Sequence, residues 1–209
     1  MRYARPLIAG SAAVLTAILG ATAAFAATTW TIKPGGAVTT TGMNVVSTDT
    51  KTRSNWTCQS VALTGKLHSG SGLSGSGAGS ISAVTFTHCT NPLDVTSRVT
   101  FSLTATDLPW HINLSSYGNG VVTGSISHLQ MHLTGPNCTA VLGGSSATAI
   151  DGHVKFSYTN STGRLKVLTT AGNLHFYNVM GCAGLWNTGD PLTISGAFPL
   201  NPKQAITSP

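Results

Sequence analysis

Apolar and polar residues alternate one by one over many short stretches of this chain, which is the pattern of a β-strand with one buried and one wetted face. Residues 153–158 show it most clearly, because Val154, Phe156 and Tyr158 form an apolar row and the residues between them do not. After residue 26 no window keeps the 3.6-residue period of a helix. The pattern predicts an all-β fold, a β-sandwich or distorted barrel of short antiparallel strands.

Turn-forming residues between the apolar stretches delimit the predicted strands, because Gly, Asn, Asp and Pro supply the backbone angles that turns need. Asn119-Gly120 and Asp151-Gly152 predict two-residue hairpins, the second joining residues 147–150 to 153–158. The Gly/Ser run 69–80 predicts a flexible surface loop. The predicted strands are residues 30–33, 43–47, 55–63, 80–87, 98–104, 110–114, 121–133, 138–142, 153–158, 165–169, 174–179 and 192–198.

The beginning of the chain has the pattern of an export signal. Arg2 and Arg5 precede an apolar segment, residues 7–19, and Ala24 and Ala26 fit the small-residue rule for signal-peptidase cleavage. The alternative, a membrane anchor, is weakened by the Gly, Ser and Thr residues that interrupt the apolar segment. We therefore expect a signal peptide at 1–26, a single all-β domain at 27–209 with no membrane span, and a secreted, extracellular or cell-wall-associated protein.

Four cysteines in an exported chain predict a disulfide-stapled fold, and four cysteines permit three pairings. We favour Cys58 with Cys89, because antiparallel strands on either side of the Gly/Ser run would bring their ends together. That choice leaves Cys138 with Cys182. A zinc site is disfavoured, since the thiols are far apart in the sequence and no C-x-x-C is present.

Charge is sparse and scattered. The formal net charge is +6, of which Arg2 and Arg5 contribute two, and glutamate is absent. Binding to nucleic acid usually needs basic residues clustered on one face, and no such cluster occurs here, so we expect no nucleic-acid partner. The shortage of long charged side chains also argues against helices.

No recognisable catalytic motif is present. Residues 70–75 match G-x-G-x-x-G, but they precede a strand instead of opening a helix, so the match carries no nucleotide-binding meaning. His128 and His132 share one face of a predicted strand, where a separation of about 13 Å prevents them from binding one ion. A Ser-His-Asp site stays open, because its members need not be close in the sequence. Paired carboxylates could come only from Asp49, Asp94, Asp107, Asp151 and Asp190.

Aromatic residues near strand ends provide a weak indication of binding. Trp30, Trp56, Trp110, Trp186 and Tyr117 could stack on a sugar or on an apolar partner surface, although most tryptophans of a β-sandwich only pack in its core. From this set we predict Trp110, Tyr117 and Trp186 as binding residues.

Four segments resemble small exported β-rich proteins of actinobacteria: residues 29–36 (TWTIKPGG), 173–179 (NLHFYNV), 181–185 (GCAGL) and 203–209 (KQAITSP). The likeness spans nearly the whole chain after the leader. It implies export and β structure, and it assigns no activity, substrate or site residue.

The sequence therefore favours a secreted, non-enzymatic β-sandwich protein, a binding or cell-surface module whose ligand is a glycan, the cell wall or a protein surface. The alternative is a secreted hydrolase with a His/Asp/Ser site. We expect no cofactor, no metal and no catalytic residue in the first of these.

Overall fold

The computed structural model describes residues 29–92 and 98–209, and this part of the chain contains strands and no α-helix. The predicted leader, residues 1–26, lies outside the described residues. The fifteen strands are β1 (Thr29–Lys33), β2 (Gly36–Asp49), β3 (Asn55–Leu67), β4 (Gly70–Ser74), β5 (Gly79–Pro92), β6 (Arg98–Thr106), β7 (Trp110–Gly118), β8 (Val121–Ser127), β9 (Gln130–Gly135), β10 (Cys138–Gly143), β11 (His153–Thr159), β12 (Arg164–Gly172), β13 (His175–Met180), β14 (Leu192–Pro199) and β15 (Ala205–Thr207).

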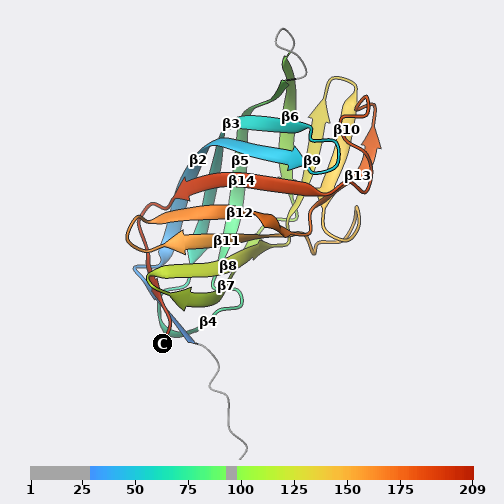
Figure 1. Cartoon of the computed structure of the whole chain (residues 1–209). Coiled ribbons are helices and arrows are strands. Elements are labelled where there is room, and N and C mark those ends of the chain that lie inside the picture. The colour runs from blue at the N-terminus through green and yellow to red at the C-terminus, as the bar shows by residue number, and fades with distance from the viewer. Residues whose placement is uncertain (1–28, 93–97) are drawn as a thin grey trace, which may run out of the picture.

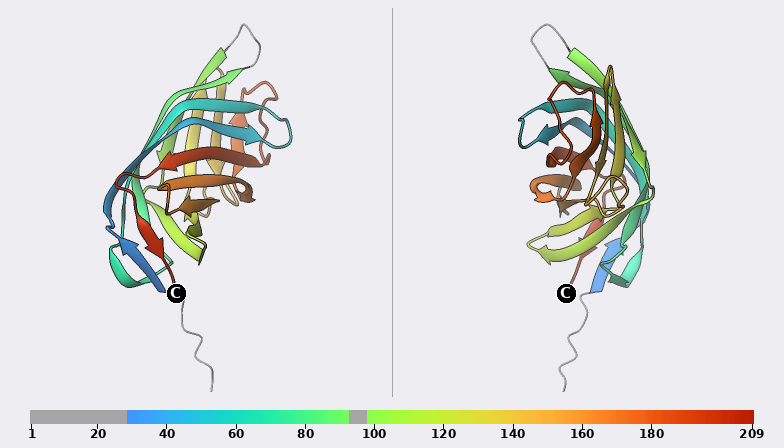
Figure 2. Two further views of the ribbon diagram at one scale, coloured as in Figure 1. Left: turned by 60° about the vertical axis from the view of Figure 1, so that its left-hand side comes forward. Right: turned by 90° about the vertical axis from the view of Figure 1, so that its right-hand side faces the viewer.

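Eight antiparallel strands close into a barrel in the order β5-β3-β2-β14-β12-β11-β8-β7 (Figure 1). The N-terminal part of β5 closes the ring by pairing with β7, where Ile81 lies opposite Trp110. In Figure 2 the blue and cyan strands β2 and β3 curve strongly along their length. In β2 the buried side changes from even to odd positions between Gly42 and Val45, across Asn44, whose φ is +51°. The all-β prediction is confirmed, and its barrel form is the one observed.

Beyond the barrel, β5 continues into a second sheet. Its C-terminal part pairs with β6, which leads on through β9 and β10 to the edge strand β13. These four strands and residues 181–191 are called the lobe below, and they lie to the right in Figure 1. A separate sheet of three strands, β15-β1-β4, is called the end sheet, and it lies at the same end of the barrel as the C-terminus.

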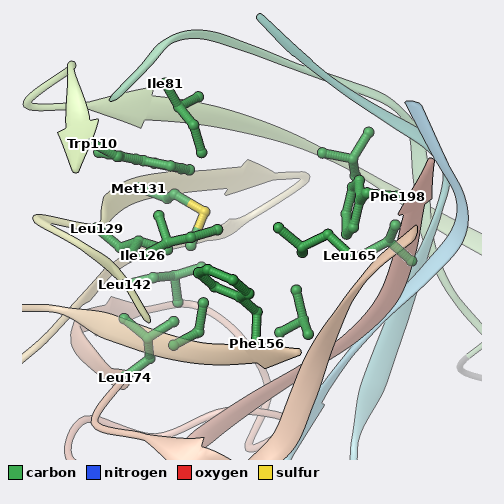
Figure 3. Packing of buried hydrophobic residues seen from close by; sticks show 14 of the residues in the cluster. Ile81, Trp110, Ile126, Leu129, Met131, Leu142, Phe156, Leu165, Leu174 and Phe198 are labelled. Atoms are coloured by element: carbon green, nitrogen blue, oxygen red, sulfur yellow. The ribbon is translucent and has the colours of Figure 1, made fainter. Parts of the chain in front are cut away.

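The buried apolar side chains form one continuous cluster that spans the barrel and the lobe. In Figure 3 the side chains of Ile81, Trp110, Ile126 and Met131, which come from four different strands, point into the same interior. The predicted apolar row of β11 is part of this cluster, because Val154, Phe156 and Tyr158 are all buried.

The Gly/Ser run was wrongly predicted to be a flexible loop. Residues 70–74 form β4, which pairs with β1 and places Leu73 opposite Trp30. Local composition gives no apolar alternation here, so the strand depends on a partner from a distant part of the chain. The short strand β15 was not predicted for the same reason.

The single strand predicted at residues 121–133 is two strands. The chain bends at His128, whose φ is +64°, so that β8 stays in the barrel and β9 enters the lobe. Leu129, between them, forms a backbone hydrogen bond of 2.9 Å to the carbonyl of Gly152. The alternation of residues 128–133 therefore does not belong to one pleated strand.

One predicted hairpin is confirmed and the other is wrong. Asn119 and Gly120, with φ of +52° and +75°, connect β7 to β8, and Gly118 lies opposite Val121. Residues 147–150 form no strand, and β11 pairs instead with β8 and β12. Asp151 accepts a hydrogen bond from the amide of Ser145, so it organises a loop and not a two-residue turn.

Both favoured disulfides are present. Cys58 and Cys89 are directly opposite each other on β3 and β5, with sulfur atoms 1.98 Å apart. The Cys138–Cys182 bond, at 2.05 Å, ties β10 to the loop after β13. One disulfide thus lies in the barrel wall and the other holds the lobe.

Candidate ligand-binding cavity

The interior of the barrel contains a cavity of about 70 Å³. Its wall is apolar apart from one serine and a disulfide sulfur, and it draws side chains from the barrel strands and from β6, β9 and the segment between β8 and β9. The lining residues are Val45, Ser47, Trp56, Cys58, Val61, Leu63, Ile81, Val84, Phe86, Leu103, Trp110, Ile126, Leu129, Met131, Val154, Leu165, Val167, Ile194 and Phe198.

The alternating pattern of each strand makes this wall apolar. On β12, Leu165 and Val167 are buried and face the cavity, whereas Lys166 between them is exposed. Cross-strand partners share a face of the sheet, so the inward rows of neighbouring strands meet in the interior. The cavity wall is therefore assembled from many local alternations that the sequence displays.

Several inward-facing side chains are only half-buried. Leu63, Val84, Phe86, Leu103 and Ile194 all line the cavity, yet none of them reaches the burial of the surrounding core. A protein core is normally packed as densely as an organic crystal. An eight-stranded barrel has an interior that side chains can fill or that can hold one small ligand. Here the side chains do not fill it.

The size and the chemistry of the cavity limit its occupant. Apolar cavities stay dry and accept apolar molecules, and a cavity of roughly 150 Å³ is large enough for benzene. The present cavity is about half of that size. It suits a very small apolar molecule as it stands, and a larger one only if the half-buried side chains move.

The three predicted binding residues lie in three different places. Trp110 lines the cavity, is 4% exposed, and donates a hydrogen bond from Nε1 to the carbonyl of Thr106 at 3.1 Å. Tyr117 is half-buried and lies opposite Val122, outside the lining. Trp186 is 1% exposed inside the lobe. Among these, only Trp110 belongs to the cavity, and neither tryptophan presents a ring face to solvent.

The aromatic residues of the lobe form a packed cluster. Trp186 lies edge-on to Trp56 at 5.3 Å and to Phe101 at 5.0 Å between ring centroids, and it stacks on Phe176 at 5.8 Å. Such pairs stabilise beyond their buried area. The cluster joins the lobe to the cavity, because Trp56 belongs to both.

A polar groove on the outside of the barrel brings together residue types that a hydrolase would need. Ser127 of β8 is the strand partner of His153 of β11, and Asp151 and Lys155 line the same groove. Hydrogen bonds from Ser145, backbone first, hold the pKa of Asp151 below its ordinary value. Among the described residues no hydrogen bond joins the His153 ring to Ser127 or Asp151. The groove therefore lacks the contacts that activate a serine nucleophile.

The ring of His128 contacts His111 and not His132, with which it was predicted to share a strand face. Its ring lies edge-on to His111 with 4.3 Å between centroids, while His132 is exposed on β9. The bend after β8 separates His128 and His132, so the expected distance along one strand does not apply. Within residues 29–92 and 98–209 no group of three or more metal-ligating side chains converges.

Two aspartates come together where β2 and the lobe meet. Asp49 and Asp190 are 0% and 4% exposed, and Lys51 Nζ lies 3.1 Å from Asp190 Oδ1. Burial raises the pKa of Asp190, but the hydrogen bonds from Asn187 and Lys51 and the Lys51 charge outweigh it, so the pKa lies below its ordinary value. The pair is closed to solvent and fastens the β2–β3 turn to the lobe.

Ser47 is a cavity residue that the sequence reasoning missed. It is 5% exposed and sits in the inward row of β2, two positions after Val45. A hydroxyl where the alternation calls for an apolar side chain is the signal that could have drawn attention to it.

In the described part of the chain no helix is long and apolar enough to cross a membrane. No protein-family model, curated protein or solved structure matches this chain.

Proposed function

We propose that this is an exported, disulfide-bonded protein that binds one small apolar molecule inside its barrel. The observation that carries the proposal is the unfilled apolar interior, a cavity of about 70 Å³ whose wall includes half-buried Leu63, Val84 and Ile194. Small-molecule sites are concave and mostly apolar, with few polar groups. The interior has this character, whereas the outer polar groove lacks the contacts of a hydrolase.

Export is supported by the leader pattern, by two disulfides and by the resemblance to small exported β-rich proteins. Disulfides persist mainly in oxidising compartments. Mass spectrometry of the protein recovered from its own culture medium tests this part, with Ala27 as the expected first residue. A chain retained in the cells with Met1 attached would contradict it.

Binding can be followed through tryptophan, because Trp56 and Trp110 line the cavity. Benzene is a rigid apolar probe that the cavity can admit only when the half-buried side chains move apart, and we expect it to change the tryptophan fluorescence of the disulfide-bonded protein in a saturable way. Replacing Trp110 with Phe should remove a large part of the change, because one of the two reporting rings is then absent.

A filling variant separates interior binding from surface binding. Val84→Phe adds bulk on the cavity side of β5 and should weaken benzene binding at least tenfold. Thr85→Phe adds the same ring at the next, exposed position of the strand and should leave binding unchanged. Equal binding by both variants and the wild type, or no saturable binding at all, would overturn the proposal.

A further inference from the structure

A second apolar cavity, of about 30 Å³, adjoins the first one inside the barrel. Five residues line both cavities, and each comes from a different barrel strand: Leu63, Ile81, Ile126, Leu165 and Phe198. Figure 3 shows Ile81, Ile126, Leu165 and Phe198 directed into the interior. The five residues are called the constriction below, because they form the boundary between two compartments of one interior.

The two compartments follow each other along the barrel strands. On β2 the first cavity is lined by Val45, toward the lobe, and the second by Val38, close to the point where the chain leaves the end sheet. The chain around β14 shows the same order, since Ile194 lines the first cavity and Leu200, which leads toward β15, lines the second. The unfilled space is therefore elongated along the strands.

The constriction is loosely packed on one side. Leu63 lines both cavities and is only half-buried. The ring of Phe198 lies close against Gly42 of β2, where an added Cβ would be 2.5 Å from the ring atom Cε1. The missing side chain at Gly42 thus leaves the ring a place beside the wall. Side chains that border empty space make fewer packing contacts, so Leu63 can change its rotamer at a lower cost than a residue of a dense core.

Neither cavity wall suits a charged or strongly polar occupant. No Lys, Arg, His, Asp or Glu lines either cavity. Thr40 is a buried residue at the second cavity, and its hydroxyl already donates a hydrogen bond of 2.8 Å to the carbonyl of Pro199. Transfer of a polar group from water to a site without a hydrogen-bond partner is unfavourable. An occupant that extends through both compartments must therefore be apolar along its length.

The shape of the space favours a chain over a ring or a branched molecule. A benzene ring needs roughly 150 Å³, which is about twice the volume of the first compartment. An unbranched chain of methylene groups is narrow at every point, so it can lie through the constriction and contact both walls. Each methylene group that becomes buried strengthens binding roughly fourfold.

We infer that the occupant of the barrel is a short unbranched aliphatic chain that passes through the constriction and fills both compartments. This inference rests on the proposed function and narrows it from small apolar molecules in general to linear ones.

Two isomers of the same formula test the shape of the occupant. n-Hexane and 2,2-dimethylbutane contain the same atoms, but the branched isomer is too thick to lie through the constriction. We expect n-hexane to bind the disulfide-bonded protein at least about tenfold more tightly, because the branched isomer leaves the second compartment empty. Titration in sealed cells, followed by tryptophan fluorescence, measures both affinities.

NMR of ¹³C-labelled leucine methyl groups shows where each molecule lies. Leu103 lines only the first cavity, and Leu200 lines only the second. We expect n-hexane to shift the methyl signals of both residues, and 2,2-dimethylbutane and benzene to shift those of Leu103 alone. Leu103→Met and Leu200→Met assign the signals.

A variant that fills only the second compartment tests whether that compartment is used. Val38→Phe adds bulk at a buried position that lines the second cavity and not the first. It should weaken n-hexane binding about tenfold and leave benzene binding unchanged. Ala37→Phe is the matched control, because it adds a ring at the adjacent, exposed position of β2 and should change neither affinity. Circular dichroism in the near ultraviolet checks that both variants keep the wild-type packing.

The outcomes are separable. Tighter binding of n-hexane, with methyl shifts in both compartments and a loss of affinity in Val38→Phe, supports the inference. Equal binding of the two isomers, or n-hexane shifts confined to Leu103, overturns the inference and leaves the proposed function standing as long as benzene binds. No saturable binding of benzene or of either isomer overturns both. The wild-type experiments decide by themselves if Val38→Phe does not fold.

Discussion

The barrel and the lobe are built from the same kind of strand, yet they are filled differently. In the lobe, Trp186 is enclosed by Trp56, Phe101 and Phe176, with ring centroids 5.0 to 5.8 Å apart. In the barrel, inward-facing side chains such as Leu63 and Val84 are half-buried around a cavity. Aromatic rings from several elements can interlock across a thin lobe, whereas aliphatic side chains from a ring of strands meet only partly at its centre. The comparison indicates that the lobe is tightly packed, whereas the barrel keeps unfilled space, which is where we propose that a ligand binds.

The largest expected effect is the loss of the Trp186 ring. Trp186→Ala should lower the free energy of unfolding by about 3–5 kcal/mol, because it removes a fully enclosed aromatic side chain. Leu63→Ala in the barrel should cost about 2 kcal/mol, at the low end for leucine, since the site already adjoins empty space. Urea unfolding of both variants checks the difference. Equal losses would contradict the contrast in packing.

Removal of the lobe disulfide comes next. On the chain-entropy model Cys138→Ser with Cys182→Ser should cost about 4 kcal/mol. Hydrogen exchange should accelerate in β10 and β13 before it does so in β2 and β3. Cys58→Ser with Cys89→Ser is the control, because β3 and β5 pair along most of their length without the bond. Uniform acceleration over the whole chain in the first variant would show that barrel and lobe open together.

The aspartate pair at the junction of the two regions predicts a pH dependence. The pKa of Asp190 is lowered from 3.8 in the folded chain, so its contribution is present above that pH and is lost as the pH falls through the lowered value. Asp190→Asn should cost about 1–3 kcal/mol at neutral pH and should reduce the loss of stability as the pH falls below 3.8. Urea unfolding at several pH values measures both.

Asp107→Asn is the matched control, since Asp107 is exposed in the turn before β7. It should leave the acid transition in place. A wild-type transition that Asp190→Asn does not change would mean that other carboxylates dominate the acid response.

The smallest expected effect on stability comes from enlarging a buried or half-buried side chain by one or two methylene groups. Val84→Leu enlarges a side chain beside the cavity and should change stability by less than about 1 kcal/mol. Ala140→Val, in a buried position of the lobe strand β10, should cost about 1–3 kcal/mol through overpacking. Thermal unfolding compares the two. A destabilising Val84→Leu would show that the barrel interior is rigid and cannot adapt to a ligand.

The sequence predicted the type of most elements but not all of their limits. The apolar row of β11, the strand β12 and the Asn119-Gly120 turn depend on neighbours in the chain, and they were predicted correctly. The strand β4 was missed because its Gly/Ser residues show no alternation of apolar and polar side chains. It forms a strand by pairing with β1. The break at His128 was missed because a positive φ interrupts an otherwise alternating stretch.

The candidate site was less predictable than the fold. Aromatic residues near strand ends suggested Trp110, Tyr117 and Trp186, and only Trp110 lines the cavity. Ser47 lies beside Trp56 because of the register between β2 and β3. Asp49 lies near Asp190 because of where the loop before β14 is placed. No local pattern encodes that proximity.

The sequence by itself determined the strand character of the chain, because a two-residue alternation of apolar and polar side chains is a local property. It also favoured the correct disulfide pairing, because the predicted strands on either side of the Gly/Ser run bring Cys58 and Cys89 together. What only the tertiary structure decided is that β5 closes on β7 to make a barrel and continues into a lobe, and that the barrel interior stays partly empty. Closure depends on the twist of the eight barrel strands, and filling depends on the summed volume of side chains from those strands and from β6 and β9.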